Sequence, residues 1–316
     1  MRYTFLGPSG TFTETALLTL DEAVTGERFP SNSVPAALNA VREGAADAAM
    51  VPIENSVEGG VTATLDAIAL GGNLRIIREV LVPIRFVLVA RAGVTLADVR
   101  RISTHSHAWA QVRQWSQERL PEVEYVPGQS TAAAALQLLS NDNPGYEAAI
   151  CAPAVAEAHP ELQILESDIG DNKQAVTRFV LIARDPEIPA PTGADKTTLM
   201  VPLPEDRPGA LLELLQQFST CGVNLSRIES RPTGNFLGSY FFSIDLDGHL
   251  HDARMRTALR GLHRVSPGVT FLGSYPRADV RRTEVDAHHQ DAAFDQARDW
   301  VESLFPGGRP DHLSQR

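Results

Sequence analysis

The chain has 316 residues and a formal net charge of -11, with 43% hydrophobic and 21% charged residues. These values are ordinary for a folded globular protein and exclude wholesale disorder. The length exceeds the usual size of one hydrophobic core, so we expect two or three domains. The acidic balance excludes nucleic acid and an anionic membrane as expected partners, because both require a basic face. An anionic small molecule could still be held by a local group of hydrogen-bond donors.

Cys151 and Cys221 are the two cysteines of the chain. They are too few for a disulfide framework or a thiolate metal site, and we expect both to be buried thiols. No stretch reaches the ~20 consecutive apolar residues that a membrane helix needs. The first residues lack the basic and apolar regions of a secretory signal. We therefore expect a cytoplasmic protein.

From Met1 to Arg184, short apolar runs alternate with helix-like segments, a pattern typical of an α/β domain with mostly parallel strands. The runs predicted to be strands are 3–6, 48–53, 84–90, 101–104, 148–152 and 179–183. Helices are predicted between them, such as 34–43, which ends at Gly44, and 132–139, which Ser130 caps. This length fits two βα lobes.

Residues 185–195 contain Pro186, Pro189 and Pro191 and are predicted to form a linker, since proline resists both helices and central strands. The region 196–276 then predicts a ferredoxin-like βαββαβ domain. Its predicted elements are 197–202, 208–220, 223–230, 238–246, 252–264 and 269–275. The tail, 277–316, begins with polar residues and is predicted to contain an amphipathic helix.

Polar residues gather at the ends of two predicted strands and at a helix start, where α/β proteins bind ligands. The turn Gly7–Thr13 leads into a helix whose first N–H groups suit an anion. Glu54, Asn55 and Ser56 directly follow the strand at 48–53, and Ser33 opens another helix. Helix capping by Thr11 or Ser33 and ordinary loop polarity are the structural alternatives.

Two further segments carry reactive side chains. His105-Ser106-His107 enters a helix that includes Gln111, and its two histidines lack a third ligand nearby in sequence, so we predict no metal site. Thr177 and Arg178 precede the last strand of the α/β region, where a hydroxyl and a guanidinium could equally be generic strand-entry residues. The chain contains neither a Walker loop with its lysine nor a complete dinucleotide fingerprint, and we expect no cofactor.

Five segments, in the family's order, resemble the signature motifs of prephenate dehydratases. They are Gly7–Thr13, Val51–Ser56, Thr177–Phe179, Arg207–Leu211 and Ile228–Pro232. The resemblance extends over nearly the whole chain and is to the monofunctional form with a C-terminal ACT regulatory domain. One segment departs from the family, which usually has His-Pro-Gln at the position of His105.

The resemblance implies a two-lobed catalytic domain of the type II periplasmic-binding-protein kind at 1–184. Lobe one would comprise 1–80 and 167–184, and lobe two 81–166. It further implies the linker 185–195, the ACT domain 196–276 and the tail 277–316. The implied reaction is the decarboxylative dehydration of prephenate to phenylpyruvate in phenylalanine biosynthesis.

The resemblance also implies roles for individual residues. Thr177 would stabilise the leaving hydroxide, Arg178 would anchor the retained carboxylate, and Glu54 would orient neighbouring groups. The substrate-binding residues it implies are Thr11, Ser33, Asn55, Ser56, Gln111 and Phe179. The allosteric phenylalanine site it implies comprises Gly209, Ala210, Leu211, Asn224, Leu225, Glu229 and Ser230, completed across the interface of a homodimer or homotetramer.

Two alternatives differ in function. An arogenate dehydratase would carry the same motifs, because arogenate differs from prephenate only in a side-chain amino group. A non-catalytic cytosolic amino-acid sensor could use the same two-lobed fold, but such a protein would be expected to lack the Thr177-Arg178 pair. Incubation with each substrate distinguishes these alternatives.

Overall fold

A computed structural model describes residues 1–69, 73–203, 205, 207–232 and 240–305. The chain forms two compact units, one of residues 1–73 and 79–184 and one of residues 74–78 and 185 onward. The first residues of the predicted strand 238–246 and the end of the predicted tail, 306–316, lie outside the described residues.

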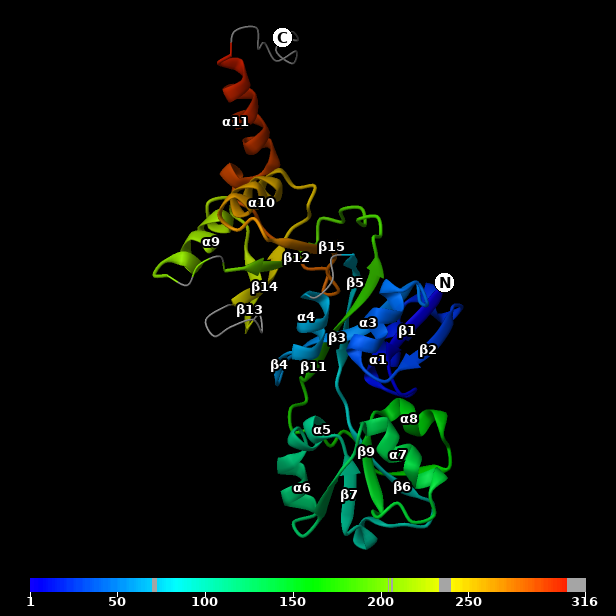
Figure 1. Ribbon diagram of the computed structural model, residues 1–316. Coiled ribbons are helices and arrows are strands. Elements are labelled where there is room, and N and C mark those ends of the chain that lie inside the picture. The colour runs from blue at the N-terminus through cyan, green and yellow to red at the C-terminus, as the bar shows by residue number, and fades with distance from the viewer. Residues whose placement is uncertain (70–72, 204, 206, 233–239, 306–316) are drawn as a thin grey trace. The chain divides into compact units, whose positions relative to one another are not determined.

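The first sheet has six strands in the order β2-β1-β3-β11-β5, with β4 beside β3 (Figure 1). β1 is parallel to β2 and β3, whereas β11 is antiparallel to β3. The strands are β1 (Arg2–Leu6), β2 (Glu27–Ser31), β3 (Ala48–Asn55), β4 (Gly59–Gly60), β5 (Leu74–Pro83) and β11 (Val176–Arg184). The β3–β11 pair joins segments from the two ends of the α/β region.

The second sheet lies within the first unit and has five strands in the order β10-β6-β9-β7-β8. β7 is parallel to β8 and β9, whereas β6 is antiparallel to β9 and β10. The strands are β6 (Val87–Arg91), β7 (Arg101–Thr104), β8 (Glu124–Pro127), β9 (Ala148–Cys151) and β10 (Leu162–Glu166). The predicted α/β class is therefore confirmed, but the predicted predominance of parallel strands is not, because both sheets mix parallel and antiparallel pairs.

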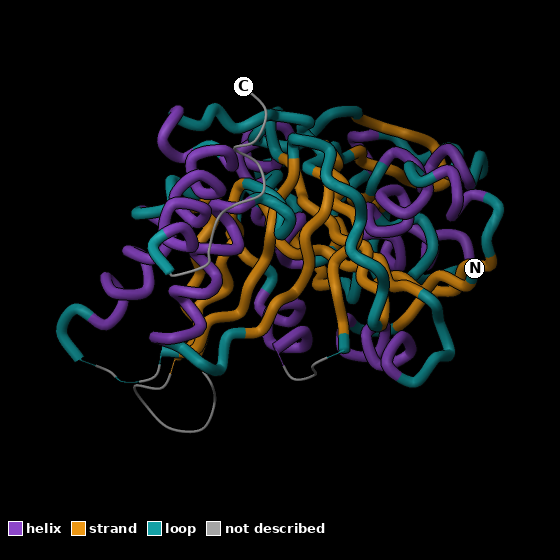
Figure 2. Tube along the Cα trace, turned by 90° about the horizontal axis from the view of Figure 1, so that it is seen from above, coloured by secondary structure: helices purple, strands orange, loops and turns teal. Residues whose placement is uncertain are grey.

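Helices lie between these strands along the chain, and Figure 2 colours helices purple and strands orange. They are α1 (Phe12–Leu18), α2 (Asp21–Val24), α3 (Val34–Arg42), α4 (Thr62–Ala69), α5 (Ser106–Ala110), α6 (Arg113–Arg119), α7 (Thr131–Ser140) and α8 (Pro153–Ala158), with a 3₁₀ turn at Leu96–Asp98. The side chains of Thr11, Ser33 and Ser130 accept backbone N–H groups at the starts of α1, α3 and α7. The predicted capping of α3 and α7 is thus observed.

Two connections join the sheets of the first unit, at 84–86 and 167–175. They bond to each other: Ile84 N donates to Ala175 O at 2.8 Å, and Ile169 N donates to Phe86 O at 3.0 Å. The family resemblance placed these crossings near residues 80 and 167. Since both connections run beside each other, the ends of strands from the two sheets approach a common space.

The second unit has a four-stranded sheet in the order β13-β14-β12-β15. Its elements are β12 (Asp195–Pro202), α9 (Ala210–Ser219), β13 (Leu225–Pro232), β14 (Tyr240–Asp247), α10 (Ala253–Val265) and β15 (Thr270–Pro276). The predicted βαββαβ order is therefore present. Leu199, Phe218, Ile244 and Leu262 belong to one core in which α9 and α10 pack on the sheet.

A last helix, α11 (Asp291–Ser303), follows a 3₁₀ turn at Ala287–His289. Phe294 packs against the core of the second unit, whereas Trp300 and Leu304 are exposed. In the part of the chain that the structure describes, no helix has the length and apolar character needed to cross a membrane. Both cysteines are free and buried, as predicted, and burial raises the pKa of the Cys151 thiol to about 12.

Candidate active site

A cavity of about 370 Å³ opens between the two sheets of the first unit. Residues of the first sheet and its loops, of the connection at 84–86 and of the segments that follow β7 and β8 line it. They are Leu6, Gly7, Thr11, Phe12, Thr13, Asn32, Asn55, Ile84, Phe86, His105, His107, Ala108, Gln111, Gln129, Ser130, Thr131 and Thr177. Four predicted site residues, Thr11, Asn55, Gln111 and Thr177, are therefore brought together.

The hydroxyl of Thr177 is held from one side by Asn55. The two residues lie opposite each other where β11 pairs with β3, and Asn55 Nδ2 donates to Thr177 Oγ1 at 2.8 Å. The orientation of the amide is fixed, because Asn55 Oδ1 accepts the backbone N–H groups of Val57 at 2.8 Å and Glu58 at 3.3 Å. Since Thr177 Oγ1 already accepts a hydrogen bond, its own proton is available for donation into the cavity.

Three helices begin at the cavity wall. Thr11, His105 and Ser130 are the N-cap residues of α1, α5 and α7, and all three line the cavity. The first N–H groups of a helix have no partner within the helix and carry a partial positive charge. These starts therefore supply donors suited to an anion, without a cationic side chain.

His105 is a neutral donor at this wall. Its Nδ1 accepts the backbone N–H of His107 at 3.3 Å, so the ring proton of the neutral form resides on Nε2. Burial, with a smaller contribution from the nearby His107, lowers the pKa of His105, which Glu58 partly opposes. His107 in turn forms an ion pair with Glu58 through Nδ1.

Gln111 leaves one polar atom unsatisfied. Its Nε2 donates to His107 O at 3.3 Å, whereas its Oε1 is buried and has no hydrogen-bond partner among the residues that the structure describes. A buried acceptor without a partner is costly, so a ligand that donates to this oxygen would be favoured.

The remaining wall is apolar. Phe12 and Phe86 meet edge to face, with ring centroids 5.7 Å apart. None of the described lining residues is a lysine, an arginine or a carboxylate. The cavity thus offers hydroxyl, amide and N–H donors beside an aromatic surface.

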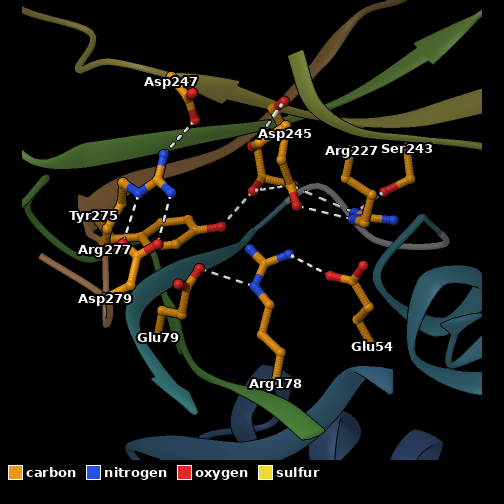
Figure 3. A network of polar contacts seen from close by, with 12 residues as sticks. Glu54, Glu79, Arg178, Arg227, Ser243, Asp245, Asp247, Tyr275, Arg277 and Asp279 are labelled. Atoms are coloured by element: carbon orange, nitrogen blue, oxygen red, sulfur yellow. Dashed lines mark hydrogen bonds and ion pairs between the residues drawn. The ribbon is translucent and has the colours of Figure 1, made fainter. Parts of the chain in front are cut away.

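Arg178 does not line this cavity. Successive residues of a strand point to opposite faces, and Arg178 lies on the face opposite to Thr177 with its side chain 6% exposed. Its Nε donates to Glu79 at 2.8 Å and its Nη1 to Glu54 at 3.3 Å (Figure 3). The predicted contact of Arg178 with a substrate carboxylate does not agree with this arrangement, and Glu54 likewise lies outside the cavity lining.

Three other predicted binding residues occupy structural positions. Ser33 caps α3 by accepting from Ala36 N at 3.2 Å. Ser56 accepts from Val176 N at 2.9 Å and so fixes the strand entry beside Thr177. Phe179 is buried at 2% exposure and is absent from the cavity lining.

Gln129, Ser130 and Thr131 line the cavity but were not predicted as site residues. They follow β8, a short strand that the sequence did not reveal. Ser130 had been recognised only as a helix cap. The rule that ligands bind beyond strand ends would have identified this segment if β8 had been predicted. Asn32, which follows β2, was missed for the same reason.

The predicted phenylalanine-site residues lie in two places in the second unit. Gly209, with φ of +84°, precedes α9, and an added Cβ there would meet no atom of the described residues within 4 Å. Asn224 and Leu225 follow the other end of α9, and Asn224 donates to Asp247 at 2.7 Å. Glu229 and Ser230 lie on β13, at an edge of the sheet. Gly209 and Asn224 do not share a described cavity.

One group of potential metal ligands exists among the described residues. Asp286, His288 and His289 have ligand atoms within 4.8 Å of one another. Two of them are exposed, and all three belong to the 3₁₀ turn of the second unit or precede it. They are separate in sequence and fold from the cavity residues.

The first unit is therefore an α/β domain of two lobes with a cavity of polar donors and aromatic rings between them. The family model for prephenate dehydratase matches residues 3–187. A prephenate dehydratase of Amycolatopsis methanolica is 41% identical over 307 residues, covering 97% of this chain and 98% of the relative. The chain belongs to the prephenate dehydratase family.

Two solved structures extend this finding. The prephenate dehydratase of Arthrobacter aurescens in complex with L-Phe is 63% identical with a TM-score of 0.92, and the match covers 96% of this chain and 99% of that one. GqqA, a quorum quenching acylase, is 30% identical with a TM-score of 0.78, covering 89% and 100%. The first similarity spans both units.

The lowered pKa of His105 makes stability depend on pH. The unfolded chain binds a proton at this residue near pH 6.5, whereas the folded chain binds it only at lower pH. Stability should therefore decrease as pH falls below about 6.5. We predict that His105→Asn, which keeps a capping side chain, shows a smaller loss between pH 7.5 and 5.5.

Urea unfolding at the two pH values, followed by tryptophan fluorescence, measures this difference. Trp109 and Trp115 lie in α5 and α6, close to His105 in sequence. His263→Asn, at an exposed position of α10, is the control. An equal loss of stability in His105→Asn and the unaltered chain would contradict the assignment.

Proposed function

We propose that the chain catalyses the decarboxylative dehydration of prephenate to phenylpyruvate, releasing carbon dioxide and water. The observation that carries this proposal is the Thr177 hydroxyl, which Asn55 fixes as a donor at the cavity. Membership of the prephenate dehydratase family supplies the substrate.

The difficult part of this reaction is the departure of hydroxide from the ring. The bond from the ring to its carboxylate breaks, and the electron pair enters the ring as the carbon–oxygen bond breaks. The leaving oxygen must receive a proton to become water. A positioned donor that strengthens its hydrogen bond as charge develops lowers the barrier, which we assign to Thr177. A threonine hydroxyl is a weak acid, so solvent ultimately supplies the proton.

The charge of the cavity suits a reaction in which one carboxylate leaves. A bidentate arginine would stabilise the departing carboxylate in the ground state and oppose its loss. We assign the retained carboxylate to the helix starts at Thr11 and Ser130 instead. The Phe12 and Phe86 rings provide an apolar surface for the ring that becomes aromatic.

Arg178 and Glu54 then have a supporting role. Both lie on the β11–β3 pair, directly beside Thr177 and Asn55 in the register. We propose that their ion pair holds these strands in place, and that Glu54 orients the pair without contacting substrate. This arrangement keeps a carboxylate away from a dianionic substrate.

We assign the first unit to the type II periplasmic-binding-protein class and the second to the ACT class. Two crossings between two α/β lobes support the first assignment. The βαββαβ order and the two motifs at Gly209 and Ile228–Pro232 support the second. The domain limits we propose are 1–184 for catalysis and 196–276 for regulation, with 185–195 as the linker.

We further propose that L-phenylalanine binds the second unit and inhibits the first. The Arthrobacter relative was solved with L-Phe bound. Gly209 offers open space at a helix start, which suits the carboxylate of an amino acid. Because α9 separates Gly209 from Asn224, a second copy would bring the two motifs together, and a homodimer or homotetramer follows.

A double-mutant cycle tests the Thr177–Asn55 pair. Thr177→Ala should lower kcat by about 10²–10³-fold, the usual cost of removing a positioned donor. Asn55→Ala should lower it by about tenfold, since it removes one orienting hydrogen bond. Thr177→Ser keeps the hydroxyl and is the control. The double variant should be no slower than Thr177→Ala alone, whereas multiplied effects would show that the two residues act independently.

Purified protein incubated separately with prephenate and arogenate, with and without L-phenylalanine, tests the activity itself. We predict phenylpyruvate from prephenate, little turnover of arogenate and a lower rate with phenylalanine.

Gly209→Ala should keep the basal rate and lose the inhibition. Preferential turnover of arogenate would assign the alternative substrate. Binding of prephenate without turnover would favour a sensor.

A further inference from the structure

Strand β5 is shared by the two units. Its residues Leu74–Arg78 belong to the second unit, and the strand continues from Glu79 to Pro83 in the first. The strand contains no glycine, and its one proline is the last residue. Such an extended segment is stiff, and residues 76 and 79 are separated by about 10 Å along it.

Residues 74–78 of β5 pack against β15. The guanidinium carbon of Arg75 lies 5.8 Å from the centroid of the Phe271 ring. A Cβ added at Gly273, which has φ of +134°, would lie 2.3 Å from the carbonyl oxygen of Ile76. The absence of a side chain at Gly273 therefore permits the close approach of β5, so the position of β15 determines that of residues 74–78.

The second half of β5 holds Arg178. The side chain of Glu79 is 2% exposed and its carboxylate accepts from Arg178 Nε at 2.8 Å. A buried charge is costly without its partner, so a displacement of Glu79 requires Arg178 to follow or to exchange partners. Figure 3 shows the guanidinium of Arg178 reaching both Glu79 and Glu54.

Arg178 follows Thr177 directly in the chain. In the β11–β3 register, Arg178 faces Glu54 and Thr177 faces Asn55, so the same two strands carry the ion pair on one face and the hydroxyl–amide pair on the other. The register is irregular just after Arg178, where a bulge re-aims side chains. A shift of Arg178 would therefore alter the position of Thr177 Oγ1 in the cavity.

We infer that β5 transmits the state of the phenylalanine site to the catalytic threonine, and that Glu79 is the positioning residue through which it acts. This inference rests on the proposed function and assigns its regulatory route. By linkage, substrate bound in the cavity must change phenylalanine affinity by the factor with which phenylalanine changes substrate affinity.

Glu79→Gln tests the positioning role, because it keeps the shape of the side chain and removes its charge. We expect kcat to fall by about tenfold or more while KM changes by less than about threefold, as for loss of an interaction that acts on the transition state. Glu79→Asp, which restores the charge, should recover part of kcat. Unchanged kcat in Glu79→Gln would overturn the role of Glu79.

The coupling route is tested at Arg75, with Arg78 as the matched control. Both arginines lie in the shared part of β5, but Arg78 donates to the carbonyl of its neighbour Ile77 rather than covering Phe271. Arg75→Ala should keep its uninhibited rate and its phenylalanine affinity within about threefold, whereas its inhibition at saturating phenylalanine should fall by at least about half. Arg78→Ala should be inhibited like the unaltered chain.

Gly273→Ala changes the same contact between β5 and β15 at a different residue. It should also weaken the inhibition by phenylalanine. Calorimetric titration with phenylalanine, run beside the rate assay, separates loss of binding from loss of coupling. If Arg75→Ala and Gly273→Ala bind phenylalanine and are inhibited as strongly as the unaltered chain, the inference is wrong. An unaltered chain that turns over prephenate but binds no phenylalanine would instead refute the proposed regulation by phenylalanine. The proposed coupling through β5 would then be refuted as well.

Discussion

The antiparallel pairing of β3 with β11 is the constraint on which the site depends. It joins residues 122 positions apart, Asn55 and Thr177, in one hydrogen bond, and it places Glu54 opposite Arg178. Because neighbouring residues of a strand face opposite ways, the pairing separates two kinds of chemistry. One face presents a donor to the cavity, and on the other the buried Arg178 pairs with the buried Glu79 and the partly exposed Glu54.

This separation explains how a chain of net charge -11 could handle a dianionic substrate. The described cavity lining has no carboxylate, so the acidic surface does not reach the reacting groups. In the proposed mechanism, helix starts and amides replace cationic side chains and bind one carboxylate while the other leaves as carbon dioxide. The neutral state of His105 fits the same pattern, since its lowered pKa leaves it a donor without charge.

Sequence patterns predicted the elements with strong apolar content and missed those without it. The sequence predicted the strands β1, β3, β7 and β9, the helix caps Ser33 and Ser130, and the βαββαβ order of the second unit. The strands β2 and β8 each contain a proline and charged residues, and β5 mixes arginine and glutamate with isoleucine, so neither alternation nor a continuous apolar run revealed them. The positions of Gln129 and Glu79 depend on these strands. The motif names Thr177 and Arg178 as neighbours, but adjacent side chains of a strand point to opposite faces, so the sequence alone did not reveal that Arg178 pairs with Glu54 and Glu79.

In the proposed mechanism Thr177, and not Arg178, contacts the reacting molecule. A crystal structure of the protein with an unreactive dicarboxylate analogue that retains the ring hydroxyl tests this contact. We expect Thr177 Oγ1 within about 2.6–3.2 Å of that hydroxyl, with Arg178 still bound to Glu79 and Glu54. An Arg178 guanidinium turned into the cavity and bound to a carboxylate of the analogue would contradict it.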